Sequence, residues 1–225
     1  MGELTKDIPK PLLPIGEKTI IEYILDAIVA CGVFHVIIVV GHKGDLIKNK
    51  LRGQYQNVSI TFVENDAPLQ SDNLYSLWCA RNYISNGMIF LNGDTLFSKS
   101  ILEKLLKDSH ENGLIADAQR SEENPIVIHE NEGRLVEIGH KIFRDVHGIA
   151  PGFYKLSQET SIRYFKEAEK VFTSGPSKGG FVIPLQRLAE EIHFQTVYQK
   201  ENEWVNINTP SDYKRAQKLV LEMYQ

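Results

Sequence analysis

The feature that most constrains this chain is a capped helix followed at once by an unbroken apolar strand. Thr19 and Glu22 have the spacing of a capping box, and apolar residues recur after them at helical intervals up to Gly32. Residues 34–40 then read Phe-His-Val-Ile-Ile-Val-Val and end at Gly41. Such a run is typical of a strand covered on both faces, so we expect a largely parallel sheet.

The same order of helix and strand repeats through the first half of the chain. We predict helices near 46–51, 72–83 and 100–107, with strands at 58–63 and 88–91. Strands that alternate with helices indicate βαβ units. The expected fold class is therefore α/β, a Rossmann-like three-layer α/β/α sandwich with a mainly parallel mixed sheet.

Short extended pieces replace this pattern in the second half. They lie at 114–118, 126–129, 134–138 and 149–154, separated by Asn-Glu-Gly and Pro-Gly turn signals. We expect them to form a small antiparallel insertion over one edge of the sheet. Later elements are predicted as helices at 159–172 and 184–192, a strand at 194–198, and a final helix at 210–223.

Composition excludes several classes of function. Among 225 residues, 29 acidic and 25 basic side chains give a net charge of -4 with no long run of one sign, which disfavours nucleic-acid and membrane partners. No apolar run approaches the roughly 18 residues of a membrane span. Cys31 and Cys79 lie in apolar stretches and suit reduced thiols, so we expect a cytoplasmic protein. The seven histidines show no zinc spacing.

Lys10 is the first candidate functional residue. Pro9, Pro11 and Pro14 surround it and favour an extended path that holds the lysine in place. A held lysine can bind a phosphate. A solvated lysine on a proline-rich arm explains the same residues.

Asp94 is the second candidate. The apolar strand at 88–91 runs out into Asn92-Gly93-Asp94, and ligands of open α/β sheets collect at the carboxyl ends of strands. A carboxylate there can hold Mg²⁺ against a nucleotide phosphate. An ordinary Gly-Asp turn that caps the next helix is the alternative.

Asn206 and Asn208 are the third candidate. Residues 203–210 alternate polar and apolar side chains before a capped helix, so the two asparagines share a face. Their amide oxygens can ligate Mg²⁺, though more weakly than carboxylates. The alternative is that they arrange a strand-to-helix turn.

Residues 71–72 precede a helix that carries Asn73, Tyr75, Trp78 and Arg81. These side chains suit one wall of a polar pocket. Helix capping with core aromatic residues explains them as well.

Taken in order, these stretches resemble the nucleotidyltransferases that join a nucleoside triphosphate to a phosphorylated small molecule. Residues 9–14 match the family's Pro-Lys-x-Leu-Leu-Pro segment, and Gly93-Asp94 matches its metal site. Residues 204–210 match its Trp-x-Asp/Glu-Ile-Asp-Thr-Pro element, with asparagine at both acidic positions.

Two further stretches resemble the phosphocholine cytidylyltransferase branch. Residues 72–77 are similar to Asn-Asn-Ile-Tyr-Ser-Leu, and residues 138–142 to Ile-Gly-Lys-Lys-Ile, followed by Gly148 and Gly152. This resemblance implies CTP and a phosphorylated alcohol or amino-alcohol such as phosphocholine. Sugar-1-phosphate members, which use UTP or dTTP, share most of the frame and remain the alternative.

The resemblance also implies residue roles and partners. Lys10 would bind the triphosphate and Lys141 the acceptor phosphate, while Asn73 and Gly93 would help to bind the nucleotide. Asp94, Asn206 and Asn208 would hold Mg²⁺, the expected cofactor. A second copy of the chain is a candidate partner.

The family begins with a buried strand and an Ala-Ala-Gly-x-Gly-Ser-Arg-Leu loop, and this sequence starts after the matching position. We therefore expect residues 1–225 to form a single nucleotidyltransferase-like domain without the first strand and glycine-rich loop. A catalytically inactive nucleotide-binding paralogue, or a truncated chain, is the second alternative.

Overall fold

The computed structural model describes residues 5–67, 73–119, 122, 124–173, 180–199 and 203–223. The chain divides into two compact units, each built from stretches that are distant in sequence. The first unit takes residues 1–70, 92–103 and 202–225, and the second takes 71–91 and 104–201. The expectation of one domain stays a prediction.

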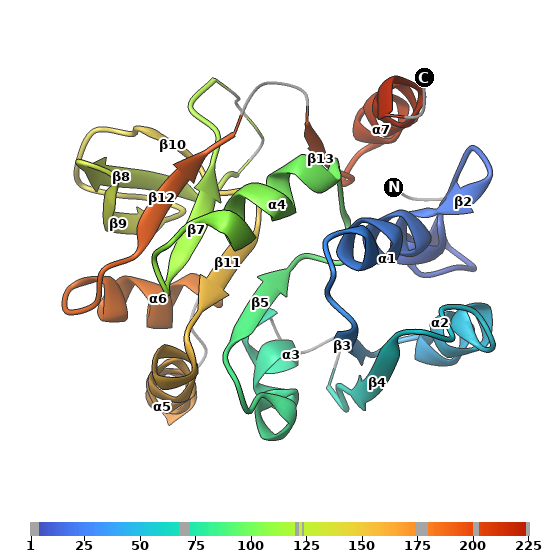
Figure 1. The fold of residues 1–225 in the computed structure, drawn as a ribbon, viewed down its shortest axis with the longest axis horizontal. Coiled ribbons are helices and arrows are strands. Elements are labelled where there is room, and N and C mark those ends of the chain that lie inside the picture. Colours follow the sequence, from blue (N-terminus) through green and yellow to red (C-terminus); the bar gives the residue numbers. More distant parts are fainter. Residues whose placement is uncertain are drawn as a thin grey trace. The chain divides into compact units, whose positions relative to one another are not determined.

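The first unit contains helices and three two-stranded sheets among its described residues. Its elements are β1 (Pro14–Ile15), β2 (Lys18–Thr19), α1 (Ile20–Ala30), β3 (His35–Val40), α2 (Gly44–Leu51), β4 (Ser59–Glu64), β6 (Thr95–Phe97), β13 (Trp204–Asn206) and α7 (Pro210–Met223). Strands β3 and β4 are parallel, whereas β6 and β13 are antiparallel. Helices α1, α2 and α7 confirm the helices predicted after Thr19, near 46–51 and at 210–223, with α2 beginning earlier, at Gly44 (Figure 1).

Strand β3 differs from its expected environment. Val36, Ile38 and Val40 occupy alternate positions and pack with a cluster that includes Leu25 of α1 and Ile47 of α2. These two helices therefore cover one face of the strand. Most of β3 is half-buried rather than fully covered on both faces.

The second unit is built on a seven-stranded sheet with the order β10-β8-β9-β12-β7-β11-β5. Its elements are α3 (Asn73–Cys79), β5 (Met88–Leu91), β7 (Gly113–Ala116), β8 (Val127–Asn131), β9 (Arg134–Gly139), β10 (Gly148–Ile149), β11 (Phe153–Leu156), α5 (Gln158–Thr173), α6 (Val182–Ala189) and β12 (Gln195–Tyr198). Helix α4 (Lys99–Lys107) runs from the first unit into the second. Figure 1 shows the order of these strands.

The α/β class and the mixed sheet are confirmed, but the expectation of mainly parallel pairing is wrong. Among the described strands, only β3–β4 and β7–β12 pair in parallel. The cause is β11, which lies between β5 and β7 and runs antiparallel to both. Strands β5, β7 and β12 therefore point the same way, but β11 separates β5 from the parallel pair of β7 and β12.

The predicted antiparallel insertion is confirmed in part. Strands β8, β9 and β10 pair antiparallel, and they extend one edge of the same sheet. The extended piece expected at 149–154 is two strands, because Gly152 has a φ of 99° between them. Only glycine adopts such a backbone readily.

One predicted helix is shorter than expected. Helix α3 ends at Cys79, and a 3-10 turn at Arg81–Tyr83 follows it. The predicted start at Asp72 lies outside the described residues. Within the described part of the chain, no helix is both long and apolar enough to span a bilayer.

Candidate active site

The first unit brings Lys10 against two other predicted site residues. The Lys10 ammonium donates a hydrogen bond to Asp94 Oδ2 at 2.9 Å and another to Asn208 Oδ1 at 2.8 Å. The side chains of Lys10 and Asp94 are 27% and 32% exposed, so the ion pair is partly shielded from water yet open to a ligand. Three residues that are distant in sequence thus share one cluster.

The backbone around Lys10 is not the expected extended arm. Residues 10–12 form a 3-10 turn, in which Leu12 N donates to Pro9 O at 2.8 Å and Leu13 N to Lys10 O at 3.0 Å. The prolines allow this turn because Pro9 stands before it and the fixed φ of Pro11 suits it. The turn fixes the Cα of Lys10, as the proline pattern predicted, by a different geometry.

Asp94 lies in the turn between β5 and β6. Its carbonyl oxygen accepts a hydrogen bond from Ile207 N at 3.0 Å, which joins this turn to the segment after β13. Gly93 lies beside Pro11, and an added Cβ would approach the Pro11 ring no closer than 4.0 Å. Protein packing therefore does not demand glycine here, and its role at a nucleotide stays a prediction.

Asn206 is held through strand pairing. Asn206 of β13 lies opposite Thr95 of β6, and Thr95 Oγ1 donates a hydrogen bond to Asn206 Oδ1. Thr95 is almost fully buried at 1% exposure. Sequence reasoning missed Thr95, although its place directly after Gly93-Asp94 was a usable signal.

Asn208 is held by the cap of α7. Asp212 Oδ2 accepts hydrogen bonds from Asn208 N at 3.1 Å, Thr209 N at 2.8 Å and Thr209 Oγ1 at 2.9 Å. Asp212 N in turn donates to Thr209 Oγ1 at 3.2 Å. Asp212 thus positions Asn208, a role that the Thr-x-x-Asp spacing at 209–212 could have indicated.

Asp94, Asn206 and Asn208 can each offer an oxygen atom, the kind of ligand that Mg²⁺ takes. No group of three or more histidine, cysteine, aspartate or glutamate side chains suited to a metal occurs among the described residues. A cation in this cluster would thus rest on one carboxylate and amide oxygens. The donor chemistry fits Mg²⁺, since that ion often uses one or two carboxylates and takes its other ligands from water and phosphate.

The remaining predicted residues belong to the second unit. Lys141 is exposed in the loop after β9, where Glu137 accepts hydrogen bonds from Phe143 N at 2.9 Å and Arg144 N at 3.2 Å. Asn73 is exposed at the first residue of α3. Both side chains are therefore exposed to solvent on the second unit.

The fold is similar to that of solved nucleotidyltransferases. It matches the inositol-1-phosphate CTP transferase from T. maritima with a TM-score of 0.78 and 21% identity, over 96% of this chain and 89% of that one. It matches the CTP:phosphocholine cytidylyltransferase from Streptococcus pneumoniae with a TM-score of 0.74 and 18% identity, over 98% and 93%. At these identities the likeness establishes the fold.

Sequence similarity identifies the family. The profile of the MobA-like NTP transferase domain matches residues 1–145, and the chain belongs to that family. The chain is also 26% identical over 226 residues to a bifunctional IPC transferase and DIPP synthase of Archaeoglobus fulgidus. That alignment covers 98% of this chain and 42% of the relative, so the chain spans less than half of that protein.

Proposed function

We propose that this protein is a nucleotidyltransferase that transfers CMP from CTP to a phosphorylated small molecule such as phosphocholine and releases pyrophosphate. The observation that carries the proposal is the contact of Lys10 with both Asp94 and Asn208. Membership of the MobA-like NTP transferase family, whose profile matches residues 1–145, supports a nucleotidyltransferase.

The reaction needs positioning and charge neutralisation more than proton transfer. An oxygen of the acceptor phosphate attacks the α-phosphorus of the nucleotide in line. The bond from that phosphorus to the bridging oxygen breaks, and pyrophosphate leaves with the electron pair. A phosphate dianion is already a competent nucleophile near neutral pH, so no side chain has to act as its base.

The predicted site residues suit these tasks. Lys10 would bind the triphosphate as a point charge, and Lys141 would bind the acceptor phosphate. Asp94, Asn206 and Asn208 would hold Mg²⁺, which when bound neutralises phosphate charge and orients the leaving group. Thr95 would orient the amide oxygen of Asn206, and Asp212 would hold the backbone of Asn208.

CTP as the preferred nucleotide rests on the stretches at 72–77 and 138–142. The two solved neighbours are both named for reactions with CTP, which supports the proposal of CTP for this chain. A catalytically inactive paralogue is the competing proposal. It is favoured by two neutral amides, Asn206 and Asn208, where the family motif carries acids.

The test is a pyrophosphate-release assay on the full chain. CTP, UTP, dTTP, GTP and ATP are each paired with phosphocholine, inositol phosphate and sugar 1-phosphates, with and without Mg²⁺. Mg²⁺-dependent release with CTP and an alcohol phosphate supports the proposal. Release confined to UTP or dTTP with a sugar 1-phosphate supports the sugar-1-phosphate alternative, and no release with any pair supports the inactive paralogue.

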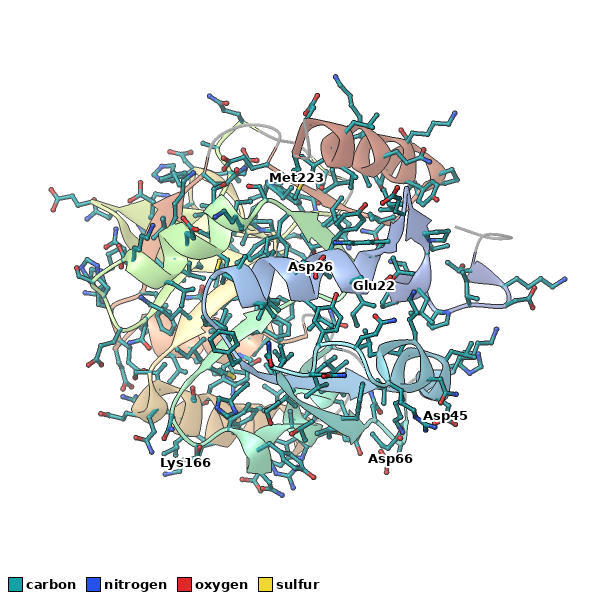
Figure 2. The ribbon with its side chains drawn as sticks, turned by 45° about the vertical axis from the view of Figure 1, so that its right-hand side comes forward. Glu22, Asp26, Asp45, Asp66, Lys166 and Met223 are labelled. Carbon is teal, nitrogen blue, oxygen red and sulfur yellow. The ribbon has the colours of Figure 1, made fainter. Side chains whose placement is uncertain are left out.

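Two variants tie the activity to the cluster. We expect Asp94→Asn to lower kcat/KM at least about 100-fold, as for loss of a charge-stabilising group. Asp45→Asn is the matched control, because the Asp45 side chain is 89% exposed and lies on α2 (Figure 2). Equal activity in the two variants would contradict the role of Asp94.

The cytoplasmic location and the second copy of the chain as a partner stay predictions.

A further inference from the structure

The cluster contains a cation that belongs to the chain itself. The Lys10 ammonium lies within hydrogen-bond distance of Asp94 Oδ2 and Asn208 Oδ1, at 2.9 and 2.8 Å. These are two of the three oxygen-bearing side chains that suit a divalent ion. Lys10 therefore neutralises the carboxylate with which a metal would have to bond.

A metal and this ammonium compete for the same carboxylate. Mg²⁺ bonds to oxygen at about 2.0–2.1 Å, so a metal on Asp94 Oδ2 would stand close to the ammonium of Lys10 as it is placed here. Two like charges at such a distance repel, and more strongly where water is partly excluded. Lys10 has to leave Asp94 before a metal can bind there at full strength.

The geometry allows that departure without rebuilding the site. The 3-10 turn fixes the backbone of Lys10, while its long side chain is 27% exposed and can rotate. Asn208 is held independently, because Asp212 accepts hydrogen bonds from Asn208 N and Thr209 N. The backbone of Asn208 thus stays in position when the ammonium moves away.

We propose that Lys10 is an internal counter-cation that occupies the metal position until a nucleoside triphosphate draws it away. The inference rests on the proposed function, since it assigns the order of binding at the same site. Lys10 exchanges the carboxylate of Asp94 for phosphate oxygens. Metal and nucleotide therefore bind as a pair, and metal alone binds poorly.

The test is a titration of the full chain with Mn²⁺ in the absence of any nucleotide, followed by calorimetry and by electron paramagnetic resonance of free Mn²⁺. Lys10→Met removes the internal cation and keeps an unbranched side chain that is one atom shorter. We expect it to bind Mn²⁺ at least about fivefold more tightly than the wild type, the effect of two like charges about 4 Å apart in bulk water. Lys10→Arg keeps the charge and should stay near the wild-type affinity.

Lys6→Met is the matched control. It removes one positive charge from the same arm, where the Lys6 side chain is exposed. It should leave Mn²⁺ affinity unchanged, and a melting curve verifies that each variant folds. An increase in Lys6→Met equal to that in Lys10→Met would overturn the inference, because net charge alone would then explain it. Unchanged affinity in Lys10→Met would overturn it as well.

Asp94→Asn separates this inference from the proposed function. If Asp94→Asn abolishes Mn²⁺ binding and Lys10→Met does not strengthen it, the metal site stands and the counter-cation role fails. If Asp94→Asn leaves Mn²⁺ binding intact, the metal is not on Asp94, and both fail. Absence of pyrophosphate release with tighter Mn²⁺ binding in Lys10→Met would instead count against the proposed reaction alone.

Discussion

Glu22 joins the start of α1 to α2, and replacing it should measurably destabilise the first unit. Its Oε2 accepts hydrogen bonds from Thr19 N at 2.8 Å and Thr19 Oγ1 at 2.7 Å. Its Oε1 lies 3.0 Å from the Lys50 ammonium. Figure 2 labels Glu22 and Asp26 one turn apart on α1. The Glu22 side chain is 11% exposed, so these contacts are poorly replaced by water.

The expected cost of Glu22→Gln follows from these contacts. Loss of a helix cap costs about 0.5–2 kcal/mol, and hydrogen bonds to a charged group contribute about 1.5–3 kcal/mol. Glutamine keeps one acceptor oxygen, so we expect a loss of about 2 kcal/mol in the free energy of unfolding. For a chain of this size that lowers Tm by about 4–8 °C.

The loss of stability in Glu22→Gln should become smaller as the pH falls. Burial alone would raise the pKa of Glu22, but the hydrogen bonds from Thr19 and the charge of Lys50 outweigh it and lower the pKa overall. The stabilisation is therefore full above the ordinary glutamate pKa of about 4.3 and is lost as pH falls through the lower folded value. The gap between wild type and Glu22→Gln should narrow in acid.

The assay is urea and thermal unfolding followed by circular dichroism at pH 7 and at acid pH. Glu17→Gln is the control, because Glu17 is exposed in the turn just before the cap. It should change stability by no more than about 0.5 kcal/mol. A Tm loss in Glu22→Gln no larger than in Glu17→Gln, or one that is the same at both pH values, would refute the reasoning.

Four other substitutions have defined outcomes. Asp212→Ala removes the cap that holds Asn208, so we expect about 1 kcal/mol less stability by urea unfolding and weaker Mg²⁺-nucleotide binding by calorimetry; unchanged binding would contradict the positioning role. Tyr154 has a buried hydroxyl with no hydrogen-bond partner among the described residues, whereas the Tyr164 hydroxyl donates to Phe181 O at 2.9 Å. Tyr154→Phe should therefore keep or raise Tm, while Tyr164→Phe should cost about 1 kcal/mol, and the reverse order would refute the comparison. Trp204 is fully buried, so Trp204→Ala should cost about 3–5 kcal/mol in urea unfolding, and a loss under 1 kcal/mol would show that the site relaxes.

The helices and most strands were predictable because their signals are local. The capping box at Thr19 and Glu22 places the start of α1, and Thr209 with Pro210 places that of α7. A β-branched run marks β3 by composition alone. Each signal lies within a few residues of the element it defines.

Strand pairing was less predictable because it depends on residues far apart. The turn signals predict an antiparallel piece at 149–154, but nothing near β11 in sequence places it between β5 and β7. Strands β6 and β13 have three residues each and are stabilised by pairing with one another. Short strands of this kind carry little periodicity of their own.

The residues of the candidate site were predictable, but the turn and the helix cap that position them were less so. Lys10, Asp94 and Asn208 were singled out from motifs, and the structure brings them into contact. The 3-10 turn under Lys10 was missed because prolines usually favour extended neighbours. The contact of Asp212 with Asn208 N was missed because it depends on three-dimensional geometry.

The large sequence separations within the cluster also determine when, during folding, the protein becomes able to bind a ligand. Lys10 is 84 residues from Asp94 and 198 from Asn208, and Thr95 is 111 from Asn206. Contacts between such distant residues close large loops and form slowly compared with helices. In a refolding experiment, helical signal should therefore return before nucleotide binding does. Nucleotide binding would therefore report the late folding step in which Lys10 and Asn208 come into contact.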